Sequence, residues 1–321
     1  MRVCATRLLT FSPRGFESPR LGILINGYVV DVARSFAALY DASPPSWFTD
    51  LKLLIEGGGI ALDLLKRVAG DFERDLKSSN PSISRYVYKP DEIDYYPPIT
   101  SPEKILCLAL NYMSHAREVG GKPPSEPYVF QKPLSSLTGH ERPVLIPRSS
   151  EKVDHEVELA VIIGRRGKYI ERSRAYEYIF GYTVFNDISY RDKQMAAGPE
   201  RQSPYGLRWL HGKGMDTAAP TGPWIVTKDE IQDPQNLRLS LKVNGETRQD
   251  GNTSDMIFKI DRIIEFISDG ITLKPGDIIA TGTPSGVGMA AGRFLKHGDV
   301  VEAYIENIGV LRNRIFREGA I

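Results

Sequence analysis

Short apolar runs broken by glycine, proline and asparagine dominate the N-terminal part of the chain and predict a small unit of strands and helices. Asn26-Gly27 separates two such runs, and both residues tolerate the positive φ that a two-residue hairpin requires. Between residues 50 and 80 apolar residues recur at helical spacing, and Gly57-Gly58-Gly59 divides them into two helices. No Lys-Ser/Thr follows the glycines, which argues against a phosphate loop. The predicted strands of this unit cover residues 3–11, 20–25 and 28–32.

After the proline-rich residues 95–99 the apolar runs become longer and are mostly typical of strands. One helix is predicted over residues 261–269, and Asn244-Gly245 is a second hairpin signal. The regular strand–helix alternation of a doubly wound sheet is missing, so we predict a β-rich α+β fold. We place a domain boundary near residue 98, between a small N-terminal domain (1–98) and a larger domain (99–321). The predicted strands of the larger domain include residues 104–110, 154–164, 180–187, 223–226, 239–248, 277–283, 300–305 and 309–316.

Composition narrows the function classes only slightly. The 321 residues can bury a full core, and 41 basic against 40 acidic residues give a formal charge of +1. Such a balance does not favour nucleic acid or an anionic membrane as a partner. Arginines interrupt the apolar N-terminus, and no run approaches the roughly 20 apolar residues of a membrane span, so we expect a cytoplasmic protein. Cys4 and Cys107 lie far apart and form no redox or metal spacing.

Three acidic residues are the candidate metal ligands. Glu156 and Glu158 stand at the head of a β-branched apolar run, where strand geometry directs both side chains to one face. Asp187 closes the next apolar run and is placed to add a third carboxylate. Like charges repel, so we expect a cation between them, and oxygen ligands favour Mg²⁺ or Mn²⁺ over Zn²⁺. The alternative is an exposed strand edge that carries the two glutamates by chance.

His115 and Glu118 form a candidate general-base pair. If Ser114 caps a helix, these two residues lie three apart and share a helix face. The carboxylate could then orient the imidazole and stabilise its protonated form. The alternative is a surface helix with an unrelated histidine and acid.

Several further polar residues are candidates for substrate contacts. Lys132, between Phe130 and Pro133, either holds a substrate carboxylate or is a solvated loop residue. Arg191 and Gln194 follow Asp187, and the glycine- and proline-flanked residues 198–206 are suited to a closing lid. Lys213 stands between two glycines, where the backbone could approach a ligand closely, or it is an exposed amine in an ordinary turn.

Together these blocks resemble the fumarylacetoacetate hydrolase family over roughly residues 100 to 310. Each block alone is weak evidence for the family, but seven blocks in the family order are specific evidence for it. The blocks are Asn111-Tyr112-x-x-His115-x-x-Glu118, Lys132-Pro133, His155-Glu156-x-Glu158-Leu159, Asn186-Asp187-x-Ser189-x-Arg191-Asp192-x-Gln194, Gly212-Lys213, Val243-Asn244-Gly245-Glu246-x-x-Gln249 and Gly276-Asp277-x-Ile279-x-Thr281-Gly282-Thr283-Pro284-x-Gly286-Val287-Gly288.

The resemblance implies a mixed β-roll or sandwich catalytic domain, preceded by a small N-terminal extension, in a homodimer. It also implies that the metal is Mg²⁺ or Mn²⁺. The roles that carry over to this chain are metal binding by Glu156, Glu158 and Asp187; water activation by His115 and Glu118; oxyanion stabilisation by Lys213 and Gln194; and substrate binding by Arg191 and Thr283, to which we add Tyr112 and Lys132.

The implied reaction is hydrolysis of a carbon–carbon bond in a 2,4-dioxo acid, such as an acylpyruvate or fumarylpyruvate, to pyruvate and a carboxylic acid. Asn111 stands where long eukaryotic members bring an additional acidic ligand, which favours the shorter, acylpyruvase-like members. Alternatives within the family are decarboxylation of a β-keto acid such as oxaloacetate, and isomerisation of the 2-hydroxyhepta-2,4-diene-1,7-dioate type. An alternative from another function class is a non-catalytic module that binds a metal or a carboxylate. The base formed by His115 and Glu118 argues against it, because binding alone does not need a base.

Overall fold

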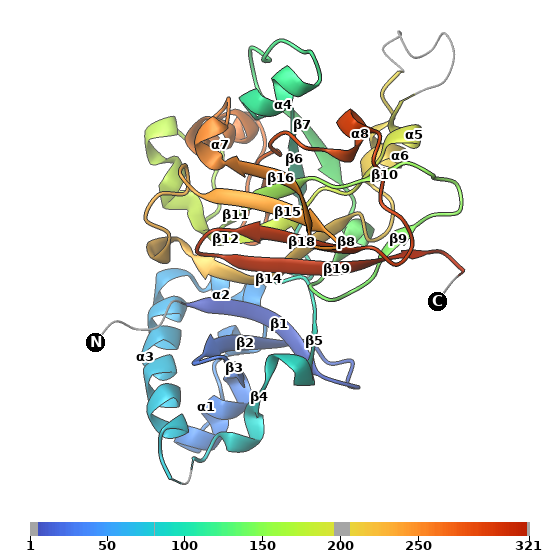
Figure 1. The fold of residues 1–321 in the computed structure, drawn as a ribbon. Coiled ribbons are helices and arrows are strands. Elements are labelled where there is room, and N and C mark those ends of the chain that lie inside the picture. The colour runs from blue at the N-terminus through green and yellow to red at the C-terminus, as the bar shows by residue number, and fades with distance from the viewer. Residues whose placement is uncertain (1–5, 80, 196–205, 320–321) are drawn as a thin grey trace.

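The computed structural model describes residues 6–79, 81–195 and 206–319. It confirms a strand-rich α+β fold, in which two large sheets are accompanied by short helices (Figure 1). The helices are α1 (Val32–Tyr40), α2 (Leu51–Glu56), α3 (Gly58–Leu76), α4 (Met113–Glu118), α5 (Arg191–Gln194), α6 (Trp209–Lys213), α7 (Ile260–Ser268) and α8 (Gly288–Ala291).

The largest sheet runs in the order β4-β3-β2-β1-β14-β12-β11-β17-β6-β7, with β5 paired to β1 and β8 paired to β14. A second sheet has the order β16-β15-β18-β19-β9, and β10 pairs with β13. The strands are β1 (Arg7–Pro13), β2 (Arg20–Ile25), β3 (Tyr28–Asp31), β4 (Val87–Tyr88), β5 (Ile93–Tyr95), β6 (Ile105–Ala109), β7 (Tyr128–Lys132), β8 (Leu137–Thr138), β9 (Val144–Ile146), β10 (Val153–Asp154), β11 (Val157–Ile163), β12 (Ile179–Asn186), β13 (Ser189–Tyr190), β14 (Ala219–Thr227), β15 (Arg238–Val243), β16 (Glu246–Asn252), β17 (Ile278–Ala280), β18 (Val300–Ile305) and β19 (Gly309–Arg317).

The N-terminal region follows most of the sequence predictions. Asn26 and Gly27 both adopt positive φ in the turn between β2 and β3, as the hairpin signal predicted. The predicted third strand is one residue too long, because Asp31 ends β3 and its carboxylate accepts a hydrogen bond from the Arg34 amide. Val32 therefore begins α1, a helix that the apolar pattern did not reveal. The triple glycine does separate two helices, with Gly57 as the break between α2 and α3.

Strand β1 connects this region to the rest of the molecule, because it pairs with β14 in the large sheet. The apolar faces of α2 and α3 also share one core with the central strands, in which Leu54 and Leu65 belong to the same cluster as Ile162 and Phe180. The division into domains 1–98 and 99–321 stays a prediction. In Figure 1 helices α1–α3 and strands β1–β3 lie below β14 and β19, in shades of blue.

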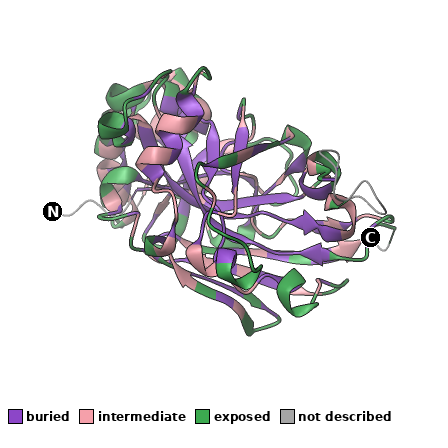
Figure 2. Ribbon diagram, turned by 90° about the horizontal axis from the view of Figure 1, so that it is seen from above, coloured by how far each residue is buried: buried purple, intermediate pink, exposed green. Residues whose placement is uncertain are grey.

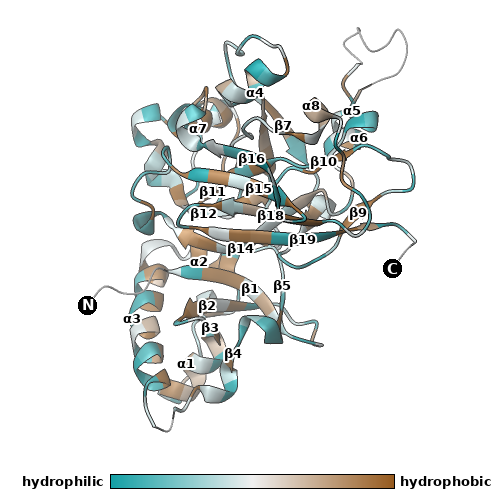
Figure 3. Ribbon diagram, viewed as in Figure 1, coloured by the Kyte–Doolittle hydropathy of each residue, from teal (hydrophilic) through white to brown (hydrophobic). Residues whose placement is uncertain are grey.

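Both faces of β11 are buried, which explains its unbroken apolar run. Leu159 and Val161 face the core shared with the second sheet, whereas Ala160 and Ile162 face the core shared with the N-terminal helices. Figure 2 shows the buried strands through the middle of the molecule and exposed helices at its periphery. Figure 3 shows the matching pattern, with hydrophobic strands and hydrophilic outer surfaces on the helices.

The ends of three central strands bring the candidate metal-ligand and catalytic residues to one place. Strand β11 pairs antiparallel with both β12 and β17, so its start lies beside the ends of those two strands. Helices α4, α5, α6 and α8 gather at the same end of the sheets (Figure 1). Among the described residues no helix is both long and apolar enough to cross a membrane.

Strands β12 and β14 pack tightly at Gly181, and a substitution there tests this contact. A Cβ atom at Gly181 would lie 2.3 Å from the carbonyl oxygen of Val226, whereas a Cβ at Gly59 in exposed α3 meets nothing within 4 Å. Overpacking a buried site costs about 1–3 kcal/mol. We predict that Gly181→Ala lowers the free energy of unfolding by this amount in urea titrations. The matched Gly59→Ala variant should be neutral or slightly stabilising, and equal effects of the two would contradict the packing.

Candidate metal centre and active site

Three buried carboxylates converge where β11 begins and β12 ends. Glu156 immediately precedes β11, Glu158 lies within it, and Asp187 follows β12. The amide of Asp187 donates to the carbonyl oxygen of Glu156 at 2.9 Å, which fixes the two ends side by side. One oxygen from each of the three carboxylates lies within 4.8 Å of the others. All three residues are buried, so the alternative of an exposed strand edge is wrong.

Two buried lysines contact this cluster. Lys213 donates from Nζ to Glu156 Oε2 and to Asp187 Oδ2, each at 2.7 Å. Lys132 Nζ contacts Asp187 Oδ1 and the carbonyl oxygen of Ile188. Neither lysine is solvated: Lys213 is 3% exposed and Lys132 is 1% exposed. The alternatives of an exposed amine at Lys213 and a solvated loop residue at Lys132 are therefore wrong.

Arg191 ties two acidic residues to Gln194. Its Nε donates to Asp154 Oδ2 at 2.9 Å, Nη2 donates to Glu156 Oε1, and Nη1 donates to Gln194 Oε1 at 3.1 Å. Arg191 contacts the oxygen of the Gln194 amide, so the NH₂ group is the part of the amide that can donate to a ligand. Arg191 thus holds one predicted metal ligand and orients a predicted oxyanion donor.

The charges in this cluster fit a divalent cation. Burial would raise the pKa of Glu156, but Lys213 and Arg191 outweigh that effect and hold the pKa well below its usual value. Burial, together with the charges of Asp187 and Glu156, raises the pKa of Glu158 well above its usual value. Glu158 accepts from the Gly282 amide through Oε2, while Oε1 is buried without a hydrogen-bond partner in the described part of the chain.

Counting Asp154, the described residues of the site contain four buried carboxylates against the three cations Lys132, Arg191 and Lys213. The unmatched carboxylate and the unpartnered oxygen of Glu158 are what a hard cation with oxygen ligands would satisfy. The residues present therefore fit Mg²⁺ or Mn²⁺, held by Glu156, Glu158 and Asp187.

His115 and Glu118 form the predicted pair on α4. Nδ1 of His115 lies 3.0 Å from Glu118 Oε2, and the other oxygen of Glu118 accepts from the Gly286 amide at 2.7 Å. A carboxylate only accepts, so Nδ1 carries the hydrogen and Nε2 is left as the proton acceptor. The predicted cap was wrong: α4 begins at Met113, and the amide of Ser114 donates to the carboxylate of Asp255. His115 is buried, which excludes a surface helix with an unrelated histidine.

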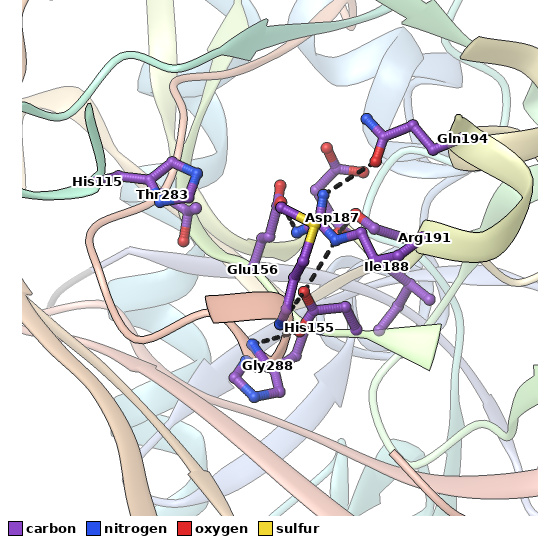
Figure 4. Close-up of polar contacts among 12 residues, drawn as sticks. His115, His155, Glu156, Asp187, Ile188, Arg191, Gln194, Thr283 and Gly288 are labelled. Carbon is purple, nitrogen blue, oxygen red and sulfur yellow. Dashed lines mark hydrogen bonds and ion pairs between the residues drawn. The ribbon is translucent and has the colours of Figure 1, made fainter. Parts of the chain in front are cut away.

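A pocket of about 150 Å³ brings these groups together. Figure 4 shows His115 and Thr283 on one side of Glu156, with Arg191 and Gln194 on the other. The pocket is lined by Leu108, Ala109, Leu110, His115, Phe130, Glu156, Arg191, Gln194, Trp209, Lys213 and Thr283. The candidate base, two cationic side chains and one candidate metal ligand therefore face one small space.

Two predicted substrate-binding residues do not line the pocket. Tyr112 is fully buried in the core, and Lys132 supports Asp187 from behind the pocket wall. The predicted lid over residues 198–206 lies almost entirely outside the described residues. The glycines around Lys213 have a packing role, since a Cβ at Gly212 would lie 2.6 Å from Cβ of Gln194.

Sequence reasoning missed the residues that support the site from behind. Asp154 holds Arg191 and also accepts from the amides of Gly288 and Met289. Gln249 contacts the segment between the two glutamates, although it comes from the second sheet. Gln249 stood in one of the seven sequence blocks, but nothing in a linear motif indicates which segments its amide connects.

Comparison with known proteins agrees with this geometry. The family model described as Fumarylacetoacetate (FAA) hydrolase C-terminal matches residues 104–316. The chain belongs to the fumarylacetoacetate hydrolase family. Members of this family are enzymes that act on small organic acids and generally bind a divalent metal.

Relatives of this family member match nearly its whole length. Bovine mitochondrial oxaloacetate tautomerase FAHD2A is 38% identical over 313 residues, which cover 96% of this chain and 91% of the relative. A putative HpcE protein from Mycobacterium smegmatis is 35% identical, with a TM-score of 0.75 and coverage of 97% and 99%. Maleylpyruvate hydrolase from Sphingobium sp. SYK-6, solved with manganese(II) and pyruvate, is 30% identical, with a TM-score of 0.71 and the same coverage.

The unpartnered oxygen of Glu158 leads to a prediction about metal binding. Glu158→Gln removes one of three adjacent buried carboxylates, so without metal the variant should be at least as stable as the wild type. It should lose Mn²⁺ binding in calorimetry and the accompanying rise in Tm. A bound ion at a hundred times its Kd contributes about 2.7 kcal/mol to the wild type.

Glu17→Gln is the control for this experiment, because Glu17 is exposed and remote from the pocket. It should retain the full Mn²⁺-dependent stabilisation. If Glu158→Gln binds Mn²⁺ as tightly as the wild type, the assignment of this carboxylate as a ligand fails.

Proposed function

We propose that this protein is a Mg²⁺- or Mn²⁺-dependent hydrolase that cleaves a 2,4-dioxo acid of the acylpyruvate or fumarylpyruvate type to pyruvate and a carboxylic acid. The observation that carries the proposal is the His115–Glu118 pair, because His115 lines the same small pocket as Glu156 of the carboxylate cluster. A metal-binding module alone does not require a base held in this orientation.

Glu156, Glu158 and Asp187 would hold the cation. When bound, the ion supplies Lewis-acid polarisation of carbonyl oxygens and attraction for a carboxylate. The protein groups around the cluster leave one negative charge unmatched, and a divalent ion would change that excess to one positive charge. The loaded site would therefore favour an anionic substrate such as a 2-oxo acid.

The pair on α4 supplies the proton transfers. Nε2 of His115 takes a proton from water as the water oxygen attacks the C4 carbonyl, and Glu118 stabilises the imidazolium that results. The bond between C3 and C4 then breaks, which releases a carboxylic acid, and its electron pair becomes a pyruvate enolate. His115 returns the proton to C3 and completes pyruvate.

Two donors that line the pocket, the Lys213 ammonium and the neutral Gln194 amide, stabilise the negative charge that develops on oxygen. Lys213 has three N–H donors, of which Glu156 and Asp187 occupy two, so one remains for an oxyanion. The Gln194 amide, held by Arg191, offers its NH₂ group. These donors are fixed before substrate enters, which is the condition under which electrostatic stabilisation is most effective.

A second candidate is keto–enol tautomerisation of oxaloacetate. The bovine tautomerase that matches almost the whole chain at 38% identity favours it. His115 would then take a proton from C3 and return it to oxygen, without activated water. Isomerisation and β-keto acid decarboxylation use the same enolate and remain alternatives, and the homodimer implied by the family also remains a prediction.

His115→Asn provides the decisive variant for the reaction. With saturating Mg²⁺ or Mn²⁺, we expect the wild type to release pyruvate from acetylpyruvate or fumarylpyruvate, measured with a lactate dehydrogenase coupled assay. Loss of a positioned general base costs roughly 10²–10⁴-fold in rate, so pyruvate release should fall by that factor in the variant. Chelation by EDTA should abolish the activity of both proteins.

His297→Asn is the control, because His297 is exposed and bonds the Arg317 amide far from the pocket. Its activity should equal that of the wild type. If the protein converts enol-oxaloacetate but releases pyruvate from no 2,4-dioxo acid, tautomerisation would replace hydrolysis as the proposed function. Undiminished hydrolysis by His115→Asn would refute the assignment of the base.

A further inference from the structure

The side chain of Gln249 occupies an unusual position, because it comes from the second sheet but reaches the active-site pocket wall. It lies on β16 and is 1% exposed. Its amide oxygen accepts from the Val157 amide at 3.1 Å and lies 3.1 Å from His155 Nδ1. Its nitrogen donates to Thr283 Oγ1 at 2.8 Å and to the Pro284 carbonyl oxygen at 3.0 Å. The hydrogen-bonding capacity of the amide is thus fully used.

These contacts determine which way the amide faces. The backbone N–H of Val157 can only donate, so the atom of Gln249 that faces it is the amide oxygen. The carbonyl of Pro284 can only accept, so the atom that faces it is the amide nitrogen. His155 must then donate through Nδ1. The Thr283 hydroxyl accepts from Gln249 and sends its own hydrogen to the Val157 carbonyl oxygen at 2.8 Å. Rotation of the amide would place a donor against the Val157 N–H and an acceptor against the Pro284 carbonyl oxygen.

Close backbone packing holds β16 against the loop that follows β17. A Cβ at Gly251 would lie 2.7 Å from Cβ of Pro284, and a Cβ at Gly286 would lie 2.0 Å from the carbonyl oxygen of Arg248. Gly286 also has a φ of +100°, which favours glycine. The approach is therefore tight enough for one amide side chain to bridge the loop and the start of β11.

The segments joined by Gln249 carry different parts of the site. Val157 lies between the metal-ligand candidates Glu156 and Glu158, while Thr283 lines the pocket. The loop that contains Thr283 also donates from the Gly286 amide to Glu118. A shift of this loop relative to β11 would therefore move the pocket wall away from the cluster.

We propose that Gln249 is a positioning residue for the reaction: its amide fixes the Thr283 side chain against the strand that bears the metal ligands, and it supports the binding of a 2-oxo acid through Thr283. The inference rests on the proposed function, since it concerns that ligand in that pocket. Gln249 lines no part of the pocket itself and acts only through its neighbours.

A double-mutant cycle with Thr283 tests this coupling. The probe is pyruvate, titrated by calorimetry into protein saturated with Mn²⁺, and the variants are Gln249→Met, Thr283→Val and both together. Gln249→Met removes the donor that holds the Thr283 hydroxyl, so it should weaken pyruvate binding by about tenfold, which corresponds to about 1.4 kcal/mol. In the Thr283→Val background the same change should have little further effect, because the group it positions is already gone.

Two controls separate positioning from stability. Gln235→Met removes another amide, whose oxygen accepts from the Ile260 amide outside the pocket, and it should leave pyruvate binding unchanged. Gln249→Glu keeps the size of the side chain and the acceptor for Val157, but its carboxylate cannot donate to Thr283. It should therefore also weaken pyruvate binding. This variant replaces Gln249→Met in the test if Gln249→Met does not fold. Thermal unfolding of each variant with Mn²⁺ checks that the protein is intact.

The outcomes distinguish this inference from the proposed function. If the wild type binds pyruvate and the folded Gln249 variants bind it as tightly, or if Gln249→Met weakens binding equally in both backgrounds, the positioning role is refuted. If the Mn²⁺-saturated wild type binds neither pyruvate, acetylpyruvate nor fumarylpyruvate, the proposed function itself fails, and the inference fails with it.

Discussion

The constraint on which the site depends is the burial of several carboxylates at one point. Glu156, Glu158 and Asp187 are closer together than buried like charges can be without compensation. Lys132, Lys213 and Arg191 compensate only in part, and the remaining oxygen of Glu158 is without a partner in the described residues. The strands around it keep the cluster in place, because their apolar faces are buried on both sides and leave the acids nowhere to move. The residues present thus fit a cation, whose charge would in turn favour anionic ligands.

The loop after β17 joins elements that otherwise belong to different sheets. Its amides donate to Glu158, to Glu118 and to Asp154, so one stretch of backbone contacts a metal-ligand candidate, the partner of the base and the residue that holds Arg191. Backbone donors have little freedom to rearrange, in contrast to long side chains. A loop that is held at so many points can keep the base, the cluster and the cationic donors in a constant relation while different substrates occupy the pocket.

Relatives named as tautomerase, isomerase and hydrolase share this fold. The chemistry of the site explains how one fold can serve all three reactions. Each reaction passes through an enol or enolate of a 2-oxo acid, and stabilising that species needs the same cation site and the same donors. What differs is whether the base removes a proton from carbon or from water. That choice depends on where substrate and water lie next to His115, which small changes in the pocket wall can alter.

Much of this protein was determined by local sequence. The alternation of apolar residues, the two Asn-Gly turns and the glycine break before α3 follow from backbone geometry and side-chain burial over a few residues, and they were predicted correctly. The pairing of His115 with Glu118 was predicted from helical spacing, and the three acids from the heads and ends of apolar runs. Other features depended on contacts between distant residues. Asp255 caps α4 in place of Ser114, Lys132 is buried behind Asp187, and Gln249 reaches Thr283 from another sheet. Local sequence limits the dihedral angles and the side chains that seek burial, but the partner of a buried polar group is decided by which distant segments the packed sheets bring within hydrogen-bond distance.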